Sequence, residues 1–244
     1  ALGAGAWPRR AETAVSATTP GVTFAPMLIL ALDTAAPATS VALHDGTSVL
    51  ASESRPGAMS HGELLAPAIA AVLARAGVDR RDVTDVAVGV GPGPFTGLRV
   101  GVVTARTLAV SLHARLHGVC SLDVIAAEAV AAGAVDDAFV VATDARRKEV
   151  YWAEYTPRGE RVGDADVMRP ADLAARLPST MPVLGRGADL YADVLARVDG
   201  PADPDAGVLA GMVAAGTAVE VGTEPLYLRR PDAAPAVQRK RASA

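Results

Sequence analysis

The residues best suited to chemistry lie where two strand-like runs end. Asp33 and Thr34 follow the apolar run 28–32, and residues 91–97 (Gly-Pro-Gly-Pro-Phe-Thr-Gly) lead from another apolar run into a helical pattern. Backbone N–H groups at such a junction, together with the dipole of the following helix, favour an anion such as phosphate. The loop 91–97 lacks the Gly-Lys-Ser/Thr ending of a P-loop, and its prolines favour the alternative of a rigid connection.

Metal binding and nucleophilic catalysis have weaker support. The four histidines, His44, His61, His113 and His117, form no His-Glu-x-x-His pattern, and Cys120 is the single cysteine. One cysteine excludes an internal disulfide and a cysteine-based zinc site, so we expect no metal site. A Ser/His/Asp triad stays open as an alternative, although no Gly-x-Ser-x-Gly elbow presents a serine.

Two predicted helices, over 64–76 and 98–115, are apolar around most of their circumference. The second carries small residues at intervals of four: Gly97, Gly101, Ala105 and Ala109. Such helices are either buried between the protein's own layers or form an interface with another subunit, and the sequence leaves both alternatives open. The turn 144–148 (Asp-Ala-Arg-Arg-Lys) is likewise either a solvated hairpin end or a basic patch for RNA or an acidic partner.

An alternation of strand and helix patterns places these residues. Three strands are predicted first, over 28–33, 40–44 and 47–53, and Asp45-Gly46 indicates a hairpin between the last two. Helices and strands then alternate over 64–76, 85–90, 98–115, 116–120 and 123–132. A second strand that ends in Asp, 139–144, indicates a duplicated lobe. We therefore expect a disordered extension (1–26), an N-lobe (27–120), a smaller C-lobe (121–231) and a flexible tail (232–244).

Composition restricts the class of protein further. Half of the 244 residues are hydrophobic, 20% are charged, and the net charge is −4. These values indicate a globular chain with no stretch long enough to span a bilayer. The acidic balance disfavours a surface built to hold nucleic-acid phosphates. Because residues 1–26 lack a secretory signal pattern, we expect a cytoplasmic protein that does not bind membranes.

The motifs taken together resemble the bacterial TsaB family, also called YeaZ, of tRNA threonylcarbamoyladenosine biosynthesis proteins. The similarity runs from Met27 to about Pro231, and its most specific piece is Gly-Pro-Gly-Pro-Phe-Thr-Gly-Leu-Arg at 91–99. Further matching stretches are Leu-Ala-Leu-Asp-Thr-Ala at 30–35, Ser-Val-Ala-Leu at 40–43, Ser-His-Gly-Glu-Leu-Leu-Ala-Pro at 60–67 and Asp-Ala-Arg-Arg-Lys-Glu-Val-Tyr at 144–151. The resemblance implies an α/β protein with the actin-like ATPase fold (ASKHA, ribonuclease H-like), in which two lobes each hold a mixed sheet flanked by helices.

The resemblance also implies which chemistry is missing. The paralogous transferase TsaD holds an iron or zinc ion partly through two histidines four residues apart, and the matching positions here are Ser121 and Ile125. Neither suits such a metal, so we expect no catalytic residue and no cofactor. Nucleotide is expected only at a subunit junction, with Asp33 and Thr34 as candidates for a vestigial phosphate site.

The function implied by the resemblance is that of a non-catalytic scaffold. Such a subunit pairs with a TsaD-like transferase as a heterodimer, is joined by a TsaE-like ATPase, reaches tRNA indirectly through the complex, and pairs with itself when alone. This shifts the open alternative for the two helices toward an interface. The predicted contacts are Leu65, Ile69, Val72, Arg99, Val102 and Arg106. The alternative functions are an ATP-dependent kinase or carbamoyltransferase of the same fold, with Asp33 and Thr34 at the phosphates, and, less favoured, a protease.

Overall fold

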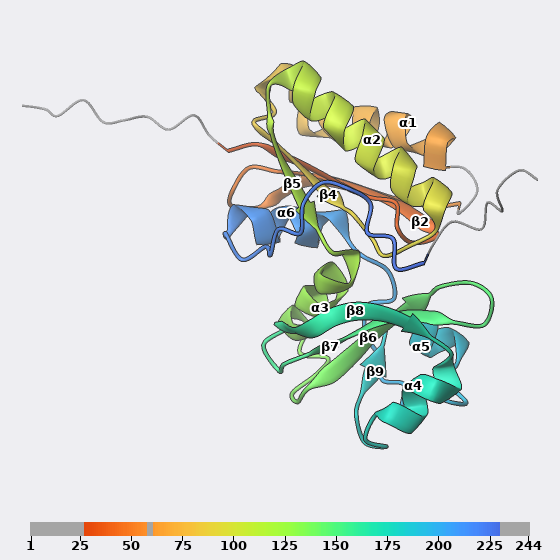
Figure 1. Ribbon diagram of the computed structural model, residues 1–244. Helices are drawn as coiled ribbons and strands as arrows, with labels where there is room; N and C mark the ends of the chain where they lie inside the picture. The colour runs from red at the N-terminus through yellow and green to blue at the C-terminus, as the bar shows by residue number, and fades with distance from the viewer. Residues whose placement is uncertain (1–26, 58–60, 230–244) are drawn as a thin grey trace, which may run out of the picture.

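The computed structural model describes residues 27–57 and 61–229. The predicted extension 1–26 and tail 232–244 lie outside these described residues. Two sheets stand one above the other, and α3 lies between them (Figure 1). The first sheet is mixed, has the strand order β3-β2-β1-β4-β5, and is built from β1 (Ile29–Asp33), β2 (Ala38–His44), β3 (Val49–Pro56), β4 (Asp85–Gly89) and β5 (Arg115–Val119).

The predicted hairpin in the first sheet is confirmed. β2 and β3 pair antiparallel around Asp45 and Gly46, and Gly46 has a φ of 90°, which favours glycine. β1 pairs antiparallel with β2 and parallel with β4. This parallel pairing requires a crossover, which α1 (His61–Ala76) provides together with the 3₁₀ turn η1 (Arg80–Asp82).

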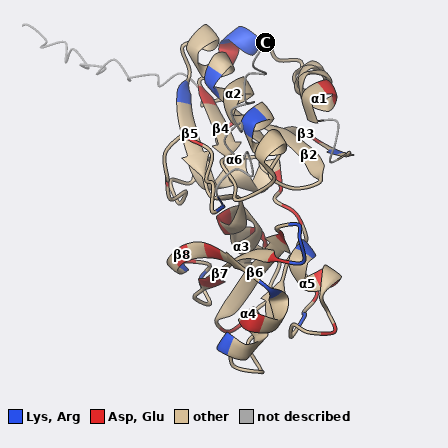
Figure 2. Cartoon of the chain, turned by 45° about the vertical axis from the view of Figure 1, so that its right-hand side comes forward, with Lys and Arg blue, Asp and Glu red and all other residues tan. Residues whose placement is uncertain are grey.

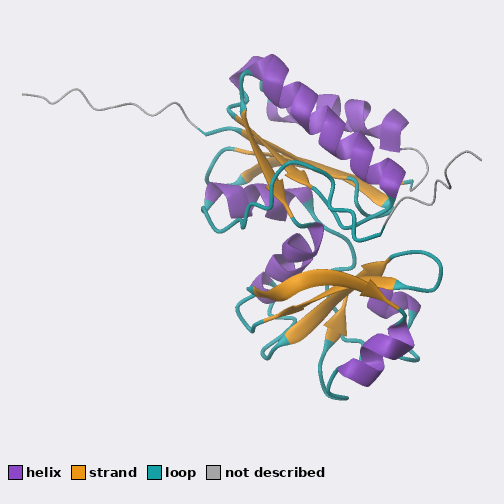
Figure 3. Cartoon of the chain, viewed as in Figure 1, coloured by secondary structure: helices purple, strands orange, loops and turns teal. Residues whose placement is uncertain are grey.

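Helices cover both faces of the first sheet. On one face lie α1 and α2 (Phe95–Leu112), and on the other lies α6 (Ala206–Ala214), as Figure 3 shows. The alternation of side chains along β1 produces this arrangement, because Leu30 and Leu32 join the core beneath α1 and α2, whereas Ile29 and Ala31 join the core with α6. A strand buried on both faces is continuously apolar, as the run 28–32 is.

The second sheet is smaller and has the order β8-β7-β6-β9. Its strands are β6 (Phe139–Asp144), β7 (Val150–Tyr155), β8 (Arg161–Met168) and β9 (Val183–Leu184), with the short helices α4 (Pro170–Arg176) and α5 (Arg186–Leu190). Helix α3 (Ser121–Ala131) packs its Leu122 and Ile125 against this sheet. The two lobes are not continuous in sequence, since α6 falls within the range predicted for the C-lobe but packs on the first sheet.

One helix differs from the sequence expectation about membranes. By length and composition, α2 could cross a bilayer, since its 18 residues have a mean hydropathy of 1.2. The expectation that no stretch is long enough was therefore wrong by this criterion. In the structure α2 lies along the first sheet and buries one side against it, and the core helix of a globular protein passes the same test.

Acidic and basic residues are present on both lobes (Figure 2).

Candidate functional site

Asp33, at the end of β1, is turned into the protein. Its Oδ1 accepts a hydrogen bond from the N–H of Ala35 (2.7 Å), and its Oδ2 accepts one from the hydroxyl of Ser121 (2.6 Å). Burial raises the pKa of Asp33 to about 6, although both hydrogen bonds act in the opposite direction. Asp33 is almost completely buried, so a phosphate could reach this carboxylate only after the surrounding residues had moved, and two negative groups would then repel each other.

The side chain of Thr34 is also hydrogen-bonded within the chain. Its Oγ1 donates a hydrogen bond to the carbonyl of Gly97 (2.7 Å) and is fully buried. A Cβ on Gly101 would lie 2.3 Å from this Oγ1, and a Cβ on Gly97 would lie 2.5 Å from the Thr34 carbonyl oxygen. The small-residue side of α2 therefore faces β1 of its own sheet. Gly97, Gly101, Ala105 and Ala109 are all buried within the chain, so this side of α2 packs between the protein's own layers.

The loop 91–97 is fastened at its base to α3. The Gly91 carbonyl accepts a hydrogen bond from the N–H of Ser121 (2.7 Å), and the Gly91 N–H donates to the hydroxyl of Ser121 (3.2 Å). Gly91 has a φ of 102°, and the Gly91–Pro92 peptide is cis. These contacts favour the interpretation of the loop as a rigid connection between β4 and α2.

A narrow cleft lies between the lobes. Its lining includes Ser121 and Ile125, the two positions at which the sequence resemblance implies the metal-binding histidines of the paralogue. The charged side chains at the cleft are paired with each other, Arg146 with Asp144 (3.3 Å) and Arg186 with Asp203. Within residues 27–57 and 61–229, no three His, Cys, Asp or Glu side chains gather in a way that could hold a metal ion.

The basic turn 144–148 forms the tip of the β6–β7 hairpin. Arg146, Arg147 and Lys148 are exposed, and all three have a positive φ, between 55° and 61°. Ala145 closes the turn by donating its N–H to the Glu149 carbonyl (3.0 Å). The hairpin position is confirmed, and a role in binding RNA or an acidic partner stays a prediction.

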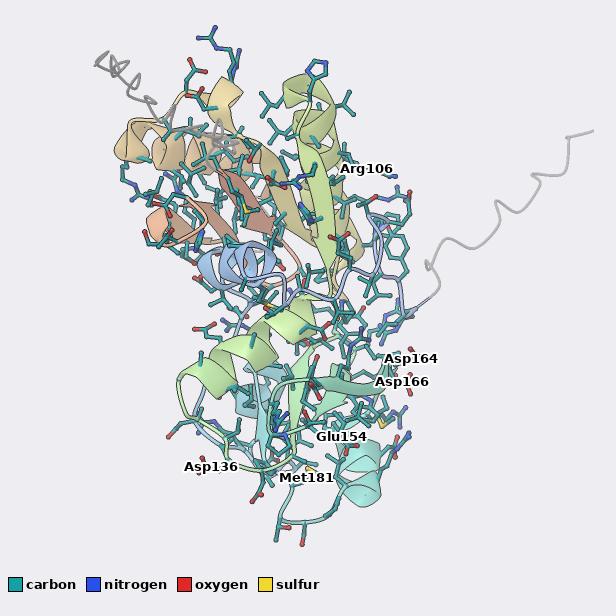
Figure 4. All side chains as sticks on the ribbon, turned by 90° about the vertical axis from the view of Figure 1, so that its left-hand side faces the viewer. Arg106, Asp136, Glu154, Asp164, Asp166 and Met181 are labelled. Carbon is teal, nitrogen blue, oxygen red and sulfur yellow. The ribbon has the colours of Figure 1, made fainter. Side chains whose placement is uncertain are left out.

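Four of the six predicted partner contacts cannot form a surface in this structure. They are Leu65, Ile69, Val72 and Val102, which belong to the core between the helices and the first sheet. The expectation was wrong for these residues because the largest apolar side chains of α1 and α2 point toward the first sheet and cover it. The other two, Arg99 and Arg106, are exposed on α2 (Figure 4 labels Arg106).

The exposed face of α2 is nevertheless apolar. Val103 is 59% exposed and Val110 is 78% exposed. Along α1, the exposed positions include the small residues Ala66, Ala70 and Ala74. Together these residues form what we call the α1–α2 face. Because successive side chains advance by about 100° around a helix, Val103 and Val110 lie opposite Gly101 and Ala105. A helical projection of the sequence that placed the small residues against the sheet would have identified Val103 and Val110 as exposed.

Comparisons with known proteins agree with this geometry. A family model for TsaD, tRNA N6-adenosine threonylcarbamoyltransferase, matches residues 55–197. An uncharacterized protein of Mycobacterium tuberculosis is 40% identical over 213 residues, which cover 85% of this chain and 94% of the relative. The tRNA threonylcarbamoyladenosine biosynthesis protein TsaB of Bacillus subtilis is 32% identical over 168 residues, 67% of this chain and 72% of the relative. YeaZ from Pseudomonas aeruginosa superposes with a TM-score of 0.69 at 30% identity, covering 83% of this chain and 100% of that chain.

The two lobes, each with a mixed sheet flanked by helices, and these matches define a TsaD-related α/β protein. Within this class, the chain belongs to the TsaB family, also called YeaZ, of tRNA threonylcarbamoyladenosine biosynthesis proteins. The resemblance found in the sequence is thereby confirmed.

Proposed function

We propose that this chain is a non-catalytic scaffold subunit of the complex that attaches a threonylcarbamoyl group to adenosine 37 of tRNA. It docks on a TsaD-like transferase through the α1–α2 face, and a TsaE-like ATPase joins the pair. The tRNA reaches the chain through the complex, and nucleotide binds only at a subunit junction. The isolated chain pairs with itself through the same face, and the complex is cytoplasmic.

The observation that carries this proposal is the exposure of Val103 and Val110 on a helix whose other side is packed. Burying two valines and the adjoining small residues against a partner removes apolar surface from water. The TsaD family model covers α1 and α2, so a TsaD-like subunit has a corresponding helix pair. Two related subunits can then pair through the same faces about an approximate two-fold axis, as homodimers do.

The hydrogen bonds of Asp33 and Thr34, together with the residues at positions 121 and 125, support the non-catalytic part of the proposal. A kinase or carbamoyltransferase that uses Asp33 and Thr34 would have to break the hydrogen bonds of both side chains to Ser121 and Gly97. A TsaD-like metal site would need ligands at positions 121 and 125, where a buried serine and a buried isoleucine stand. The scaffold function requires neither rearrangement.

The direct test is reconstitution. The chain is mixed with its cognate TsaD-like and TsaE-like proteins, ATP, threonylcarbamoyl-adenylate and a substrate tRNA, and complex formation and tRNA modification are measured with and without it. We expect the chain to co-elute with the transferase and to be required for modification. Equal modification in its absence, or turnover of ATP by the isolated chain, would contradict the scaffold function.

A further inference from the structure

The segment 217–229, here called the strap, follows α6 and runs without regular structure along the edge of the first sheet (Figures 1 and 3). Its first half is held to β5. The N–H of Val221 donates to the Gly118 carbonyl (3.0 Å), and the Glu220 carboxylate lies 2.7 Å from Nδ1 of His117. The fit is close, because a Cβ on Gly118 would lie 1.9 Å from the Gly222 carbonyl oxygen. The strap therefore covers the edge strand.

The second half of the strap reaches α2. The N–H of Leu226 donates to the Val90 carbonyl (2.8 Å), and the Leu226 side chain packs against the cores of both lobes. Glu224 pairs with Arg106 at 2.5 Å. At the far end, Arg229 donates to the Ala145 carbonyl (3.2 Å) and pairs with Glu149. The strap is thus anchored at β5, at α2 and at the β6–β7 hairpin.

Between these anchors, Tyr227 organises an exposed cluster at the start of α2. Its ring stacks on Phe95 with a centroid separation of 5.2 Å, and its hydroxyl accepts a hydrogen bond from Nε of Arg99 (3.0 Å). The Arg99 guanidinium lies 4.0 Å from the Phe95 ring centroid. Phe95 is 40% exposed and Tyr227 is 38% exposed, so a partner can reach the cluster. The ring stack and the hydrogen bond hold its side chains in place before any partner binds.

Such a cluster has the composition of a binding hot spot. The few residues that contribute most of the binding energy in protein interfaces are enriched in tryptophan, tyrosine and arginine, and prior ordering lowers the entropic cost of association. Arg99 lies two turns of helix from Arg106 and one turn from Val103, so the cluster continues the α1–α2 face. Because Arg99 binds Tyr227 through Nε, its terminal nitrogens can bind a carboxylate.

We propose that the strap forms part of the docking surface for the TsaD-like subunit, and that Tyr227 is the positioning residue that holds Phe95 and Arg99 in the orientation the partner binds. The complementary surface on the partner is an apolar helix face with a carboxylate opposite Arg99. This inference rests on the proposed function and adds the strap, which lies outside the matched region 55–197, to the docking surface.

The test measures the dissociation constant for the cognate TsaD-like protein by calorimetry. Tyr227→Ala loses the ring stack and the hydrogen bond, and we expect binding to weaken 10- to 100-fold, which corresponds to about 1.4–2.7 kcal/mol, as for a hot-spot contact. Tyr227→Phe keeps the stack and should weaken binding less than tenfold. Phe95→Ala should resemble Tyr227→Ala, which keeps the test usable if one variant fails to fold. Leu190→Ala, an exposed apolar change on α5, is the matched control and should bind like the wild type.

The outcomes separate the two proposals. Weaker binding by Tyr227→Ala and Phe95→Ala, with far-UV circular dichroism and thermal midpoint unchanged, supports the inference. Wild-type affinity in both variants would overturn it, while loss of binding in a Val103→Asp, Val110→Asp variant would leave the scaffold function standing. Altered self-association with unchanged transferase binding would assign the cluster to a second copy of this chain and also overturn the inference. No binding by the wild type would remove both proposals.

Discussion

Replacing Gly101 by alanine is expected to destabilise the protein, although alanine is the better helix former. A Cβ at this position would lie 2.3 Å from Oγ1 of Thr34 and 3.5 Å from its Cβ. Thr34 cannot move away freely, because it is fully buried and its Oγ1 donates to the Gly97 carbonyl. The variant therefore tests whether the small-residue side of α2 faces the protein's own sheet.

The magnitude follows from three contributions. Overpacking of a well-packed core costs about 1–3 kcal/mol. Loss or distortion of the Thr34 hydrogen bond adds about 1 kcal/mol. The higher helix propensity of alanine offsets about 1 kcal/mol of this sum. We expect Gly101→Ala to lower the free energy of unfolding by about 1–3 kcal/mol.

A double-mutant cycle in urea, followed by far-UV circular dichroism, provides the measurement. In a Thr34→Ala background the clashing oxygen is gone, so Gly101→Ala should cost little, and the coupling free energy between the two sites should be about 1–3 kcal/mol. Gly211→Ala in α6 is the control. Nothing lies within 4 Å of a Cβ there, so this change should stabilise the protein by up to about 1 kcal/mol. If Gly101→Ala behaved like Gly211→Ala, with no coupling to Thr34, the packing of α2 described above would be refuted.

Two further predictions concern buried ionisable groups. Burial raises the pKa of Asp33 to about 6, above an unfolded value of about 3.9, so the native state loses up to about 3 kcal/mol of stability as pH rises between those values. Asp33→Asn should abolish this decline. The prediction would be wrong if urea titrations from pH 4 to 7.5 gave the variant the same dependence of unfolding free energy on pH as the wild type. Burial also raises the pKa of Cys120 to about 12, so iodoacetamide at pH 8 should alkylate it only after unfolding. Rapid alkylation of the native protein, seen by mass spectrometry, would contradict its burial.

The first sheet could be predicted from the sequence because its signals are local. The run 28–32 ends on Asp33, and Asp45-Gly46 allows a tight turn between two strands, with a positive φ at Gly46. The position of α6 could not be predicted in this way, since its place on the first sheet depends on contacts with residues more than 160 positions earlier, such as the hydrogen bond from Ala206 N–H to Ser40 Oγ. An apolar helix alone does not indicate which sheet it covers.

In the candidate site, too, local features could be predicted and features set by long-range contacts could not. Arg99 and Arg106 were predicted as partner contacts; both are exposed on α2, and the contact itself stays a prediction. Their partners Tyr227 and Glu224 were not predicted, because the strap has neither helical nor strand periodicity and its position is set by long-range contacts. The buried apolar residues of α1 and α2 were assigned to the partner surface, since apolarity alone does not tell a core contact from an interface contact.

The most direct test of the docking function is the affinity of the α1–α2 face for the TsaD-like subunit. The Val103→Asp, Val110→Asp variant places two carboxylates on this face, and its control, Val162→Asp with Val194→Asp, places two on exposed valines of the second lobe. A buried, unpaired carboxylate costs several kcal/mol, so we expect the first variant to bind the transferase at least 1,000-fold more weakly, about 4 kcal/mol. The control should bind like the wild type. Equal affinity for both folded variants would contradict docking through this face.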